Sequence, residues 1–384
     1  MSGRTVLVLG GGVGGVVAAN RLRARLPRGD RILLIDREAH HLFQPSLLWL
    51  ATGQRTAASI QRPLARLERR GIEVVHGAIE AIDATQRMVT VSGRNLTGDA
   101  IIVSLGAELA PEAIPGLAEA GHNLYAILGA ERIRDELRSL RSGRVVVLTA
   151  APAYKCPAAP YEAAMLIEAL LRHRGVRPAV EVAMYAAEPG PMGVAGPAVS
   201  AGVRQMVESH GIRYYPDHQI IAADPATRLL RFASGATASF DLLVFIPPHR
   251  APAAVRTSRL AGETGWISVD RASFATSFDG VFAIGDVTTV PLAMGKPLPK
   301  AGVFAHRQAE VVAGNIARAW TGKGHPQAFD GQGECFVETG DGRAGFGAGN
   351  FYAEPTPEVV LRRPSRWWHW GKVLFEWRWF RQWL

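Results

Sequence analysis

The sequence predicts an α/β protein with two domains, each built of helices packed around a parallel sheet, followed by a smaller C-terminal region. Three observations predict this fold class. A glycine-rich strand–turn–helix–strand unit opens the chain, a second strand–helix–strand repeat follows in its middle, and the tail is rich in tryptophan and arginine. With 384 residues, the chain is long enough for two or three domains and a large core.

The first unit begins with an apolar run at 5–9 and continues through Gly10-Gly11-Gly12-Val13-Gly14-Gly15. A helical pattern covers 16–26, and a second apolar run at 31–35 ends on Asp36. A strand, tight turn, helix and strand that close on an acid are typical of a dinucleotide site, so we expect a Rossmann-like domain here.

Each glycine of this turn has a separate expected role. Gly10 permits the tight turn, Gly12 lets the backbone approach a pyrophosphate, and Gly15 lets the helix and strand pack closely. The helix N-terminus then presents free N–H groups and partial positive charge to the phosphates. Asp36 is expected to accept hydrogen bonds from a ribose hydroxyl.

The middle of the chain predicts a second domain of the same topology. Short strands occupy 60–110, the last of them at 99–104, and a strand at 280–284 comes late in the chain. Helices are expected at 130–140, 161–172 and 198–210, with strands at 144–149, 180–185 and 241–246, and a strand-rich appendix at 331–361. The turn at 150–162 contains no glycine, three prolines and Cys156, so a second dinucleotide could not approach its backbone. We therefore predict a degenerate NAD-type domain without its NAD site.

A strand that ends in Gly285-Asp286 points to FAD. This pair, placed after a strand in a chain that opens with the glycine turn, is typical of two-dinucleotide-fold flavoproteins, in which the Asp binds the ribitol chain. The helix that begins near Gly302 would point its N-terminus at the flavin ring. Lys300 either contacts the flavin or is an ordinary solvated lysine.

The two cysteines and a pair of adjacent histidines are the other candidate site residues. The chain has two cysteines, Cys156 and Cys335, which are too few for a secreted disulfide scaffold and, being far apart, would ordinarily be unrelated buried residues. His40 and His41 are neighbours that point apart, so we expect a loop or helix start beside the cofactor cleft and no metal site.

The net charge of +9 and pI near 10 have their source largely in the tail. Basic runs interleaved with aromatics are absent from the body of the chain, so nucleic acid is not an expected partner. At helical spacing, one apolar face of the tail is formed by Trp370, Val373, Leu374, Trp377, Phe380 and Leu384, with Trp379 and Phe375 off this stripe. This pattern favours an amphipathic helix that lies on a bilayer surface, and the alternative is a helix docked on its own core or dimer. No apolar run of eighteen residues occurs.

With these motifs in place, the chain resembles the sulfide:quinone oxidoreductases and the flavoprotein subunit of flavocytochrome c sulfide dehydrogenase. The resemblance covers nearly the whole chain. It depends on the glycine turn, Phe43-Gln44-Pro45-Ser46, Lys155-Cys156-Pro157, Pro160-Tyr161-Glu162, Gly285-Asp286, Pro299-Lys300 and Cys335.

This resemblance implies FAD-dependent oxidation of sulfide through a Cys156/Cys335 redox disulfide, with electrons passed to a membrane quinone. It assigns Glu162 to proton transfer, and the alternative is an acid that stands in the first turn of a helix because the macrodipole favours it there. Positive surroundings such as Lys155 would favour a Cys156 thiolate. FAD is expected to be non-covalent, because no cysteine lies near Phe43. The third, upstream cysteine of many members is missing, so long polysulfides are not favoured.

Other assignments stay open at this stage. The alternatives are a type II NADH dehydrogenase-like quinone reductase, a sulfide dehydrogenase subunit with a cytochrome c acceptor, or a membrane-bound flavin sensor. The sulfur acceptor, the quinone and a homo-oligomeric state are not defined by the sequence. We expect a peripheral, monotopic membrane protein, with the cytoplasmic side favoured by the expected lack of an export signal.

The expected domain division has four segments. They are a first FAD-binding segment at 1–112, the degenerate NAD-type domain with Cys156 at 113–248, a second FAD-binding segment at 249–325, and the C-terminal region with Cys335 and the tail at 326–384.

Overall fold

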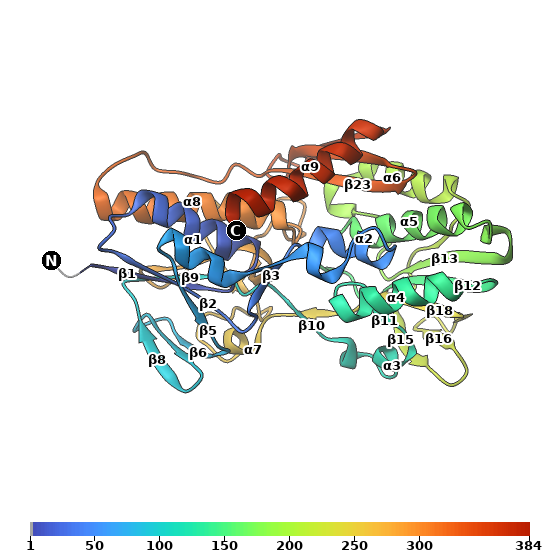
Figure 1. Cartoon of the computed structure of the whole chain (residues 1–384), viewed down its shortest axis with the longest axis horizontal. Helices are drawn as coiled ribbons and strands as arrows, with labels where there is room; N and C mark the ends of the chain where they lie inside the picture. Colours follow the sequence, from blue (N-terminus) through green and yellow to red (C-terminus); the bar gives the residue numbers. More distant parts are fainter. Residues whose placement is uncertain (1–2) are drawn as a thin grey trace.

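Two five-stranded parallel sheets form the body of the protein in a computed structural model that describes residues 3–384. Figure 1 shows them at opposite ends of an elongated molecule, with helices packed along them. The strands at the centre of both sheets are rich in Val, Ile and Leu and are mostly buried on both faces, as parallel sheets covered by helices require.

The first sheet has the order β21-β9-β1-β2-β5. Its strands are β1 (Thr5–Leu9), β2 (Arg31–Asp36), β5 (Glu73–His76), β9 (Ala100–Val103) and β21 (Val281–Ala283). Helix α1 (Val13–Arg25) packs against α8 (Gly302–Thr321) over this sheet. Because β21 pairs in parallel with β9, the chain returns to its first sheet after completing the second.

The second sheet has the order β11-β18-β12-β13-β14. Its strands are β11 (His122–Asn123), β12 (Gly143–Thr149), β13 (Val180–Ala186), β14 (Arg213–Tyr215) and β18 (Leu242–Ile246). Its helices are α3 (Leu117–Ala120), α4 (Ile127–Ser139), α5 (Ala159–His173) and α6 (Pro197–Ser209). The unit β12–α5–β13 therefore repeats the topology of β1–α1–β2, as predicted.

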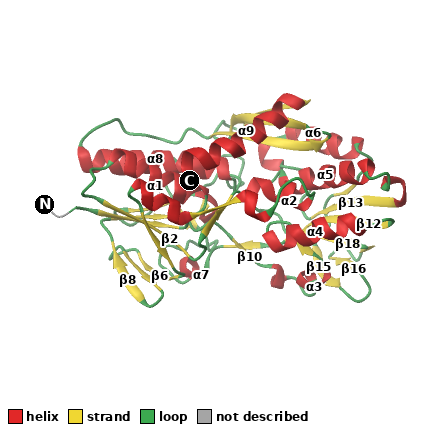
Figure 2. Ribbon diagram, in the orientation of Figure 1, coloured by secondary structure: helices red, strands yellow, loops and turns green. Residues whose placement is uncertain are grey.

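Three antiparallel sheets and three strand pairs surround these layers (Figure 2). The three-stranded sheets are β6 (Ile79–Asp83), β7 (Met88–Val91) and β8 (Arg94–Thr97); β15 (Ile220–Asp224), β16 (Leu229–Phe232) and β17 (Thr237–Ser239); and β23 (Gln332–Gly340), β24 (Arg343–Asn350) and β25 (Glu358–Ser365). The pairs are β3 (His40–Leu42) with β4 (Gln61–Pro63), β10 (Glu108–Leu109) with β19 (His249–Arg250), and β20 (Ile267–Ser268) with β22 (Thr288–Thr289). Short helices α2 (Leu47–Ala51) and α7 (Ala253–Arg256) complete the fold.

The tail forms helix α9 (Arg366–Trp383), which begins at a Ser365 cap whose hydroxyl accepts the N–H of Trp368. Figure 1 shows α9 crossing from the C-terminal sheet toward α1 and α8. One of its faces is buried, so the tail docks on its own core, which was the alternative to a purely lipid-facing helix. Within residues 3–384, none of the helices has both the length and the apolar character needed to cross a bilayer.

The predicted apolar stripe of this helix is wrong in part. Trp370, Leu374 and Trp377 are exposed, but Phe380 and Leu384 are buried, and so is Trp379, which was placed off the stripe. The physical reason is that the helix is apolar on two opposite faces. Its inward face also carries Lys372 and Glu376, which are held there by ion pairs that helical periodicity cannot reveal.

Candidate functional site

The glycine turn between β1 and α1 leaves space in front of a helix N-terminus. Gly10 has a φ of +105°, and a Cβ there would lie 2.4 Å from the Ser104 carbonyl oxygen. A Cβ on Gly15 would lie 1.8 Å from the Gly10 carbonyl oxygen, whereas a Cβ on Gly12 would have no atom within 4 Å. Among the described residues, no side chain caps α1 and no acid lies in its first turn, so its N–H groups are available to an anion.

Asp36, at the end of β2, helps to hold this turn. Its carboxylate accepts the backbone N–H of Gly11 through Oδ2 and the N–H of Glu38 through Oδ1, the latter at 2.7 Å. The acid is half-buried and lies beside the glycine turn, where a ribose hydroxyl is expected.

Gly285 and Asp286 follow β21 and face the start of α8. The N–H of Gly285, at a φ of +75°, donates to Gln308 Oε1 at 2.7 Å. Asp286 is half-buried, and its Oδ1 is enclosed and has no hydrogen-bond partner among the described residues. Burial raises the pKa of this carboxyl against the opposing effect of Lys155 and Lys300. An acceptor left free in this position suits a hydroxylated chain such as the ribitol of FAD.

Lys300 is not a solvated surface lysine. Its Nζ donates to the carbonyl oxygens of Asp286 at 2.6 Å and Thr288 at 3.0 Å, and lies 3.5 Å from the ring centre of Trp266. Burial lowers its pKa to about 8. Gly302 is the first residue of α8, and a Cβ there would make only ordinary contact with Val13. The start of α8 thus lies against the glycine turn.

Cys156 and Cys335 line the same cavity, although they are far apart in the sequence. Cys156 lies before α5 at a φ of +50°, and its N–H donates to the Lys300 carbonyl oxygen at 2.7 Å. Cys335 lies on β23, which packs against α5. The cavity has a volume of about 770 Å³ and a mostly apolar wall that also includes Lys300 and Phe304. Both cysteines are thiols in this structure.

Each cysteine is half-buried, and its exposed part faces the cavity. Burial raises the pKa of Cys156 to about 12, with a further contribution from Glu162. Burial, and then the charge of Cys156, also raises the pKa of Cys335. Lys372 of α9 is the cation that opposes these shifts at both thiols. Burial lowers the pKa of Lys155, and the charges of Asp286 and then Cys156 oppose this effect, so the expected role of Lys155 beside the Cys156 thiolate stays a prediction.

Glu162, in the first turn of α5, is bonded to the tail of the chain. Its Oε1 accepts from Lys372 Nζ at 2.7 Å and from the Glu338 N–H at 2.9 Å. The Glu338 carboxylate in turn lies 3.0 Å from His369 Nδ1. Burial raises the pKa of Glu162. Burial by itself would lower the pKa of Lys372, but the neighbouring carboxylates of Glu162 and Glu338 raise it.

Three of these residues were missed by sequence analysis, namely Lys372, Glu338 and His369. Lys372 and His369 were counted as charge and bulk in an aromatic tail, and Glu338 lies in the strand-rich appendix. The sequence does contain a signal for these contacts. Glu162, Glu338 and Lys372 lie within apolar stretches, and charged residues in such places are rarely buried unless they are paired.

Glu188 was also missed, and it explains the degenerate second domain. It lies two residues beyond the end of β13, close to the position that Asp36 holds at the end of β2, which is that of the ribose-binding acid in a nucleotide domain. Here its carboxylate accepts hydroxyl groups from Thr149 at 2.7 Å, Tyr154 at 2.5 Å and Tyr161 at 2.7 Å. The chain's own side chains thus occupy the acceptor positions that a ribose would need.

The family model for pyridine nucleotide-disulphide oxidoreductases matches residues 4–309. The chain belongs to this family. The predicted α/β fold with dinucleotide-binding domains is thereby confirmed, and FAD is the cofactor that pyridine nucleotide-disulphide oxidoreductases of this kind carry.

Among similar proteins, the sulfide-quinone reductase of Aquifex aeolicus is 27% identical over 97% of this chain and 89% of its own length. The mitochondrial sulfide:quinone oxidoreductase of Mus musculus is 23% identical over 91% of this chain and 79% of its own. The solved structure of the Aquifex aeolicus sulfide:quinone oxidoreductase superposes with a TM-score of 0.89 at 26% identity, covering 99% of this chain and 91% of that one. The resemblance stated from the motifs is confirmed.

Proposed function

We propose that this flavoprotein is a sulfide:quinone oxidoreductase. The observation that carries the proposal is the meeting of Cys156 and Cys335 at one cavity, with Cys156 bonded to Lys300 beside the predicted FAD site. The similarity to sulfide:quinone oxidoreductases along nearly the whole chain supports it. Gly10, Gly12, Gly15, Asp36, Gly285, Asp286, Lys300 and Gly302 are proposed to hold the cofactor.

In the proposed reaction, the two cysteines begin joined as a disulfide. Hydrosulfide attacks one sulfur, so that a new sulfur–sulfur bond forms, the bridge breaks and the other cysteine leaves as a thiolate. The terminal sulfur then passes to an acceptor nucleophile, and closing the bridge again releases two electrons. The mostly apolar wall of the cavity favours apolar sulfur species as ligands.

FAD, when bound, supplies the two-electron carrier between the cysteines and the quinone. Reduction of a quinone also consumes two protons, and the role proposed for Glu162 is to deliver protons. Burial raises the pKa of its carboxyl, which favours uptake of a proton, and Lys372 at 2.7 Å compensates the charge of the ionised form. The aromatic contact between Phe43 and Phe375, with ring centres 5.6 Å apart, marks the apolar route proposed for the quinone.

The exposed face of α9 is the proposed membrane contact. Trp367 is 84% exposed, and Trp370, Leu374 and Trp377 are also exposed, with Arg366 and Arg381 on the same helix. An interfacial helix with tryptophans and arginines suits a surface of anionic lipid. The cytoplasmic side, a homo-oligomer and the division at residues 112, 248 and 325 stay predictions.

The decisive test is anaerobic titration of the purified holoprotein with sulfide. Sulfide should bleach the flavin absorbance of the wild type, and decylubiquinone should restore it. C156S and C335S should keep FAD and lose rapid bleaching, since neither variant can form the bridge. Rapid bleaching in both variants would contradict the cysteine mechanism.

NADH serves as the control for the competing function. Because hydroxyl groups of the chain occupy Glu188 and no glycine lies in the turn at 150–162, NADH should leave the flavin oxidised. Rapid bleaching by NADH would favour a type II NADH dehydrogenase-like enzyme instead.

A further inference from the structure

Helix α9 is bonded to the glycine turn through a single histidine. Trp379 Nε1–H of α9 donates to His41 Nε2 at 2.9 Å, and His41 Nδ1 lies 2.8 Å from the carbonyl oxygen of Gly11. Trp379 is 2% exposed and His41 is 1% exposed, so water does not compete for these bonds. Gly11 is the second glycine of the turn, and its N–H is held by Asp36.

The donors and acceptors in this chain of bonds can be assigned. An indole N–H can only donate, so His41 Nε2 must accept. The remaining ring nitrogen, Nδ1, therefore carries the hydrogen and donates it to the Gly11 carbonyl, which can only accept. His41 is thus a neutral imidazole that transmits a fixed orientation from Trp379 to the glycine turn. Burial lowers the pKa of His41, which agrees with the neutral form.

A second set of bonds ties the C-terminal end of α9 to α1. Asn20 of α1 donates through Nδ2 to the Trp383 carbonyl oxygen at 3.2 Å. Arg70 donates to Asn20 Oδ1 and to the Gln382 carbonyl oxygen, both at 2.7 Å. The guanidinium of Arg21 lies 4.9 Å from the ring centre of Trp383. Helix α9 therefore grips both the glycine turn and the helix that this turn begins.

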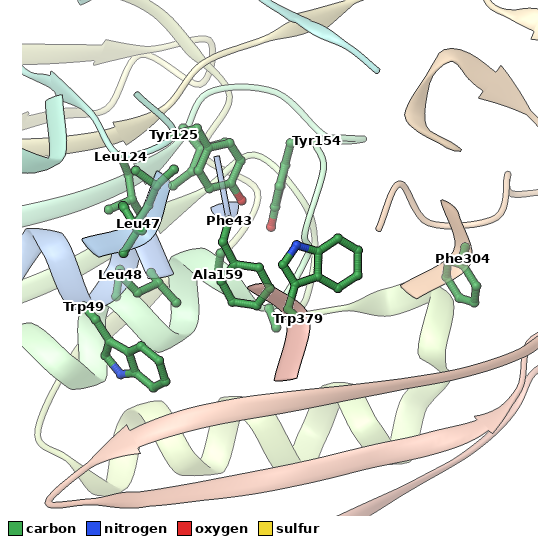
Figure 3. Close-up of a cluster of buried hydrophobic side chains, with 14 of the residues drawn as sticks. Phe43, Leu47, Leu48, Trp49, Leu124, Tyr125, Tyr154, Ala159, Phe304 and Trp379 are labelled. Carbon is green, nitrogen blue, oxygen red and sulfur yellow. The ribbon is translucent and has the colours of Figure 1, made fainter. Parts of the chain in front are cut away.

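We propose that α9 is part of the FAD-binding apparatus, with Trp379 and His41 as positioning residues for the pyrophosphate turn. Packing supports the placement, because Figure 3 shows the indole of Trp379 beside Phe43, with their ring centres 5.9 Å apart. The opposite face of this helix carries the exposed Trp370 and Trp377. One helix thus serves the proposed membrane surface outside and the cofactor turn inside.

This arrangement has a thermodynamic consequence. If docked α9 strengthens FAD binding, then bound FAD must strengthen the docking of α9 by the same factor. Loss of the cofactor should therefore loosen the membrane-facing helix. The proposal requires only FAD and the contacts above, and does not depend on sulfide oxidation.

The test compares Trp379→Phe with Trp377→Phe in the full-length holoprotein. The first variant removes the buried N–H and keeps an aromatic ring, while the second changes an exposed ring on the same helix. FAD affinity is measured by the recovery of flavin fluorescence on dilution, without sulfide or quinone. Trp379→Phe should bind FAD about tenfold more weakly, the effect of leaving one buried acceptor without its donor. Trp377→Phe should match the wild type.

Two further measurements separate positioning from general loss of structure. His41→Phe should weaken FAD binding to a similar extent, and the double variant should be no weaker than either single one, because all three break the same chain of bonds. Tryptic cleavage at Arg378 and Arg381 should accelerate when FAD is stripped from the wild type. Two results would overturn the proposal. One is that Trp379→Phe binds FAD as tightly as the wild type and has a normal circular dichroism spectrum, and the other is that the rate of tryptic cleavage does not depend on FAD.

Discussion

The buried pair of Glu162 and Lys372 shows how strongly single residues depend on one another in this protein. The two charges are almost fully enclosed and lie 2.7 Å apart, so neither has water to stabilise it alone. Their attraction offsets the desolvation of both groups only while both are present. The pair therefore contributes more to the placement of α9 against α5 than to net stability.

Lys372→Met should accordingly destabilise the protein by about 3 kcal/mol, the cost of a buried charge left without its partner. Glu162→Gln combined with Lys372→Met should recover part of this loss. Denaturant unfolding measures both effects. Arg204→Ala provides the control, because its bridge to Glu208 is half-exposed and should contribute less than about 1 kcal/mol. Equal losses in Lys372→Met and Arg204→Ala would refute this account.

His249 makes the stability depend on pH. Its Nδ1 lies 2.8 Å from the Pro247 carbonyl oxygen, and its Nε2 has no partner among the described residues. Burial first, and then the charges of Lys155 and Lys300, lower its pKa to about 3. In the unfolded chain this histidine takes up a proton near pH 6.5, whereas the folded protein does not.

The sign of the effect follows from this difference. The stabilising contribution of neutral His249 is complete above about pH 6.5 and is lost as the pH falls, by about 2 kcal/mol at pH 5. His249→Asn should therefore flatten the decrease in unfolding free energy between pH 7 and pH 5. The comparison of wild type and variant by denaturant unfolding at both pH values checks this, and parallel decreases would contradict it.

At the scale of elements, the glycines of the β1–α1 turn have different roles, some in folding and some in cofactor binding. Gly15 is needed by the fold itself, since a Cβ there would overlap the Gly10 carbonyl oxygen. Gly12 has a φ of −73° and open space in front of it, so the folded chain tolerates a methyl group at this position. The space is instead required by the cofactor.

Gly12→Ala should therefore fold normally and bind FAD at least about tenfold more weakly, because the methyl group holds the pyrophosphate away from the α1 N–H groups. The melting temperature of the FAD-free protein and the FAD dissociation constant report the two effects separately. Gly29→Ala is the matched control, since its Cβ also meets open space but lies far from the turn. Undiminished FAD affinity in Gly12→Ala would remove this glycine from the proposed site.

At the scale of the whole molecule, the proposed membrane contact places the outer face of α9 against a bilayer and its inner face against the protein core. Replacing Trp367, Trp370 and Trp377 together by serine should weaken binding to anionic vesicles by at least about tenfold. FAD content should not change, because these rings lie on the outer face. Leu128→Ser, at an exposed position on α4, should leave vesicle binding intact. Sedimentation with vesicles of phosphatidylserine and phosphatidylcholine decides the question, and unchanged sedimentation of the triple variant would exclude α9 as the contact.

Local patterns in the sequence were sufficient for the order of the elements and for the nucleotide turn. The apolar runs become β1, β2 and β12, and helices expected at 161–172 and 198–210 appear as α5 and α6 within two residues of the predicted bounds. These predictions succeed because hydrophobic periodicity and glycine geometry are properties of neighbouring residues.

The sequence by itself determined the α/β class, the glycine turn, the Gly-Asp pair and the loss of a glycine-rich second turn. Only the tertiary structure decided that Cys335 reaches the cavity of Cys156, that Lys372 faces Glu162, and that Trp379 is bonded to His41. The physical reason is that these contacts join segments separated by nearly half of the chain or more. Charge and aromatic periodicity within α9 are compatible with either face turned inward. The partners that select one face are His41 of β3, Arg55, which follows α2, and Glu162 of α5.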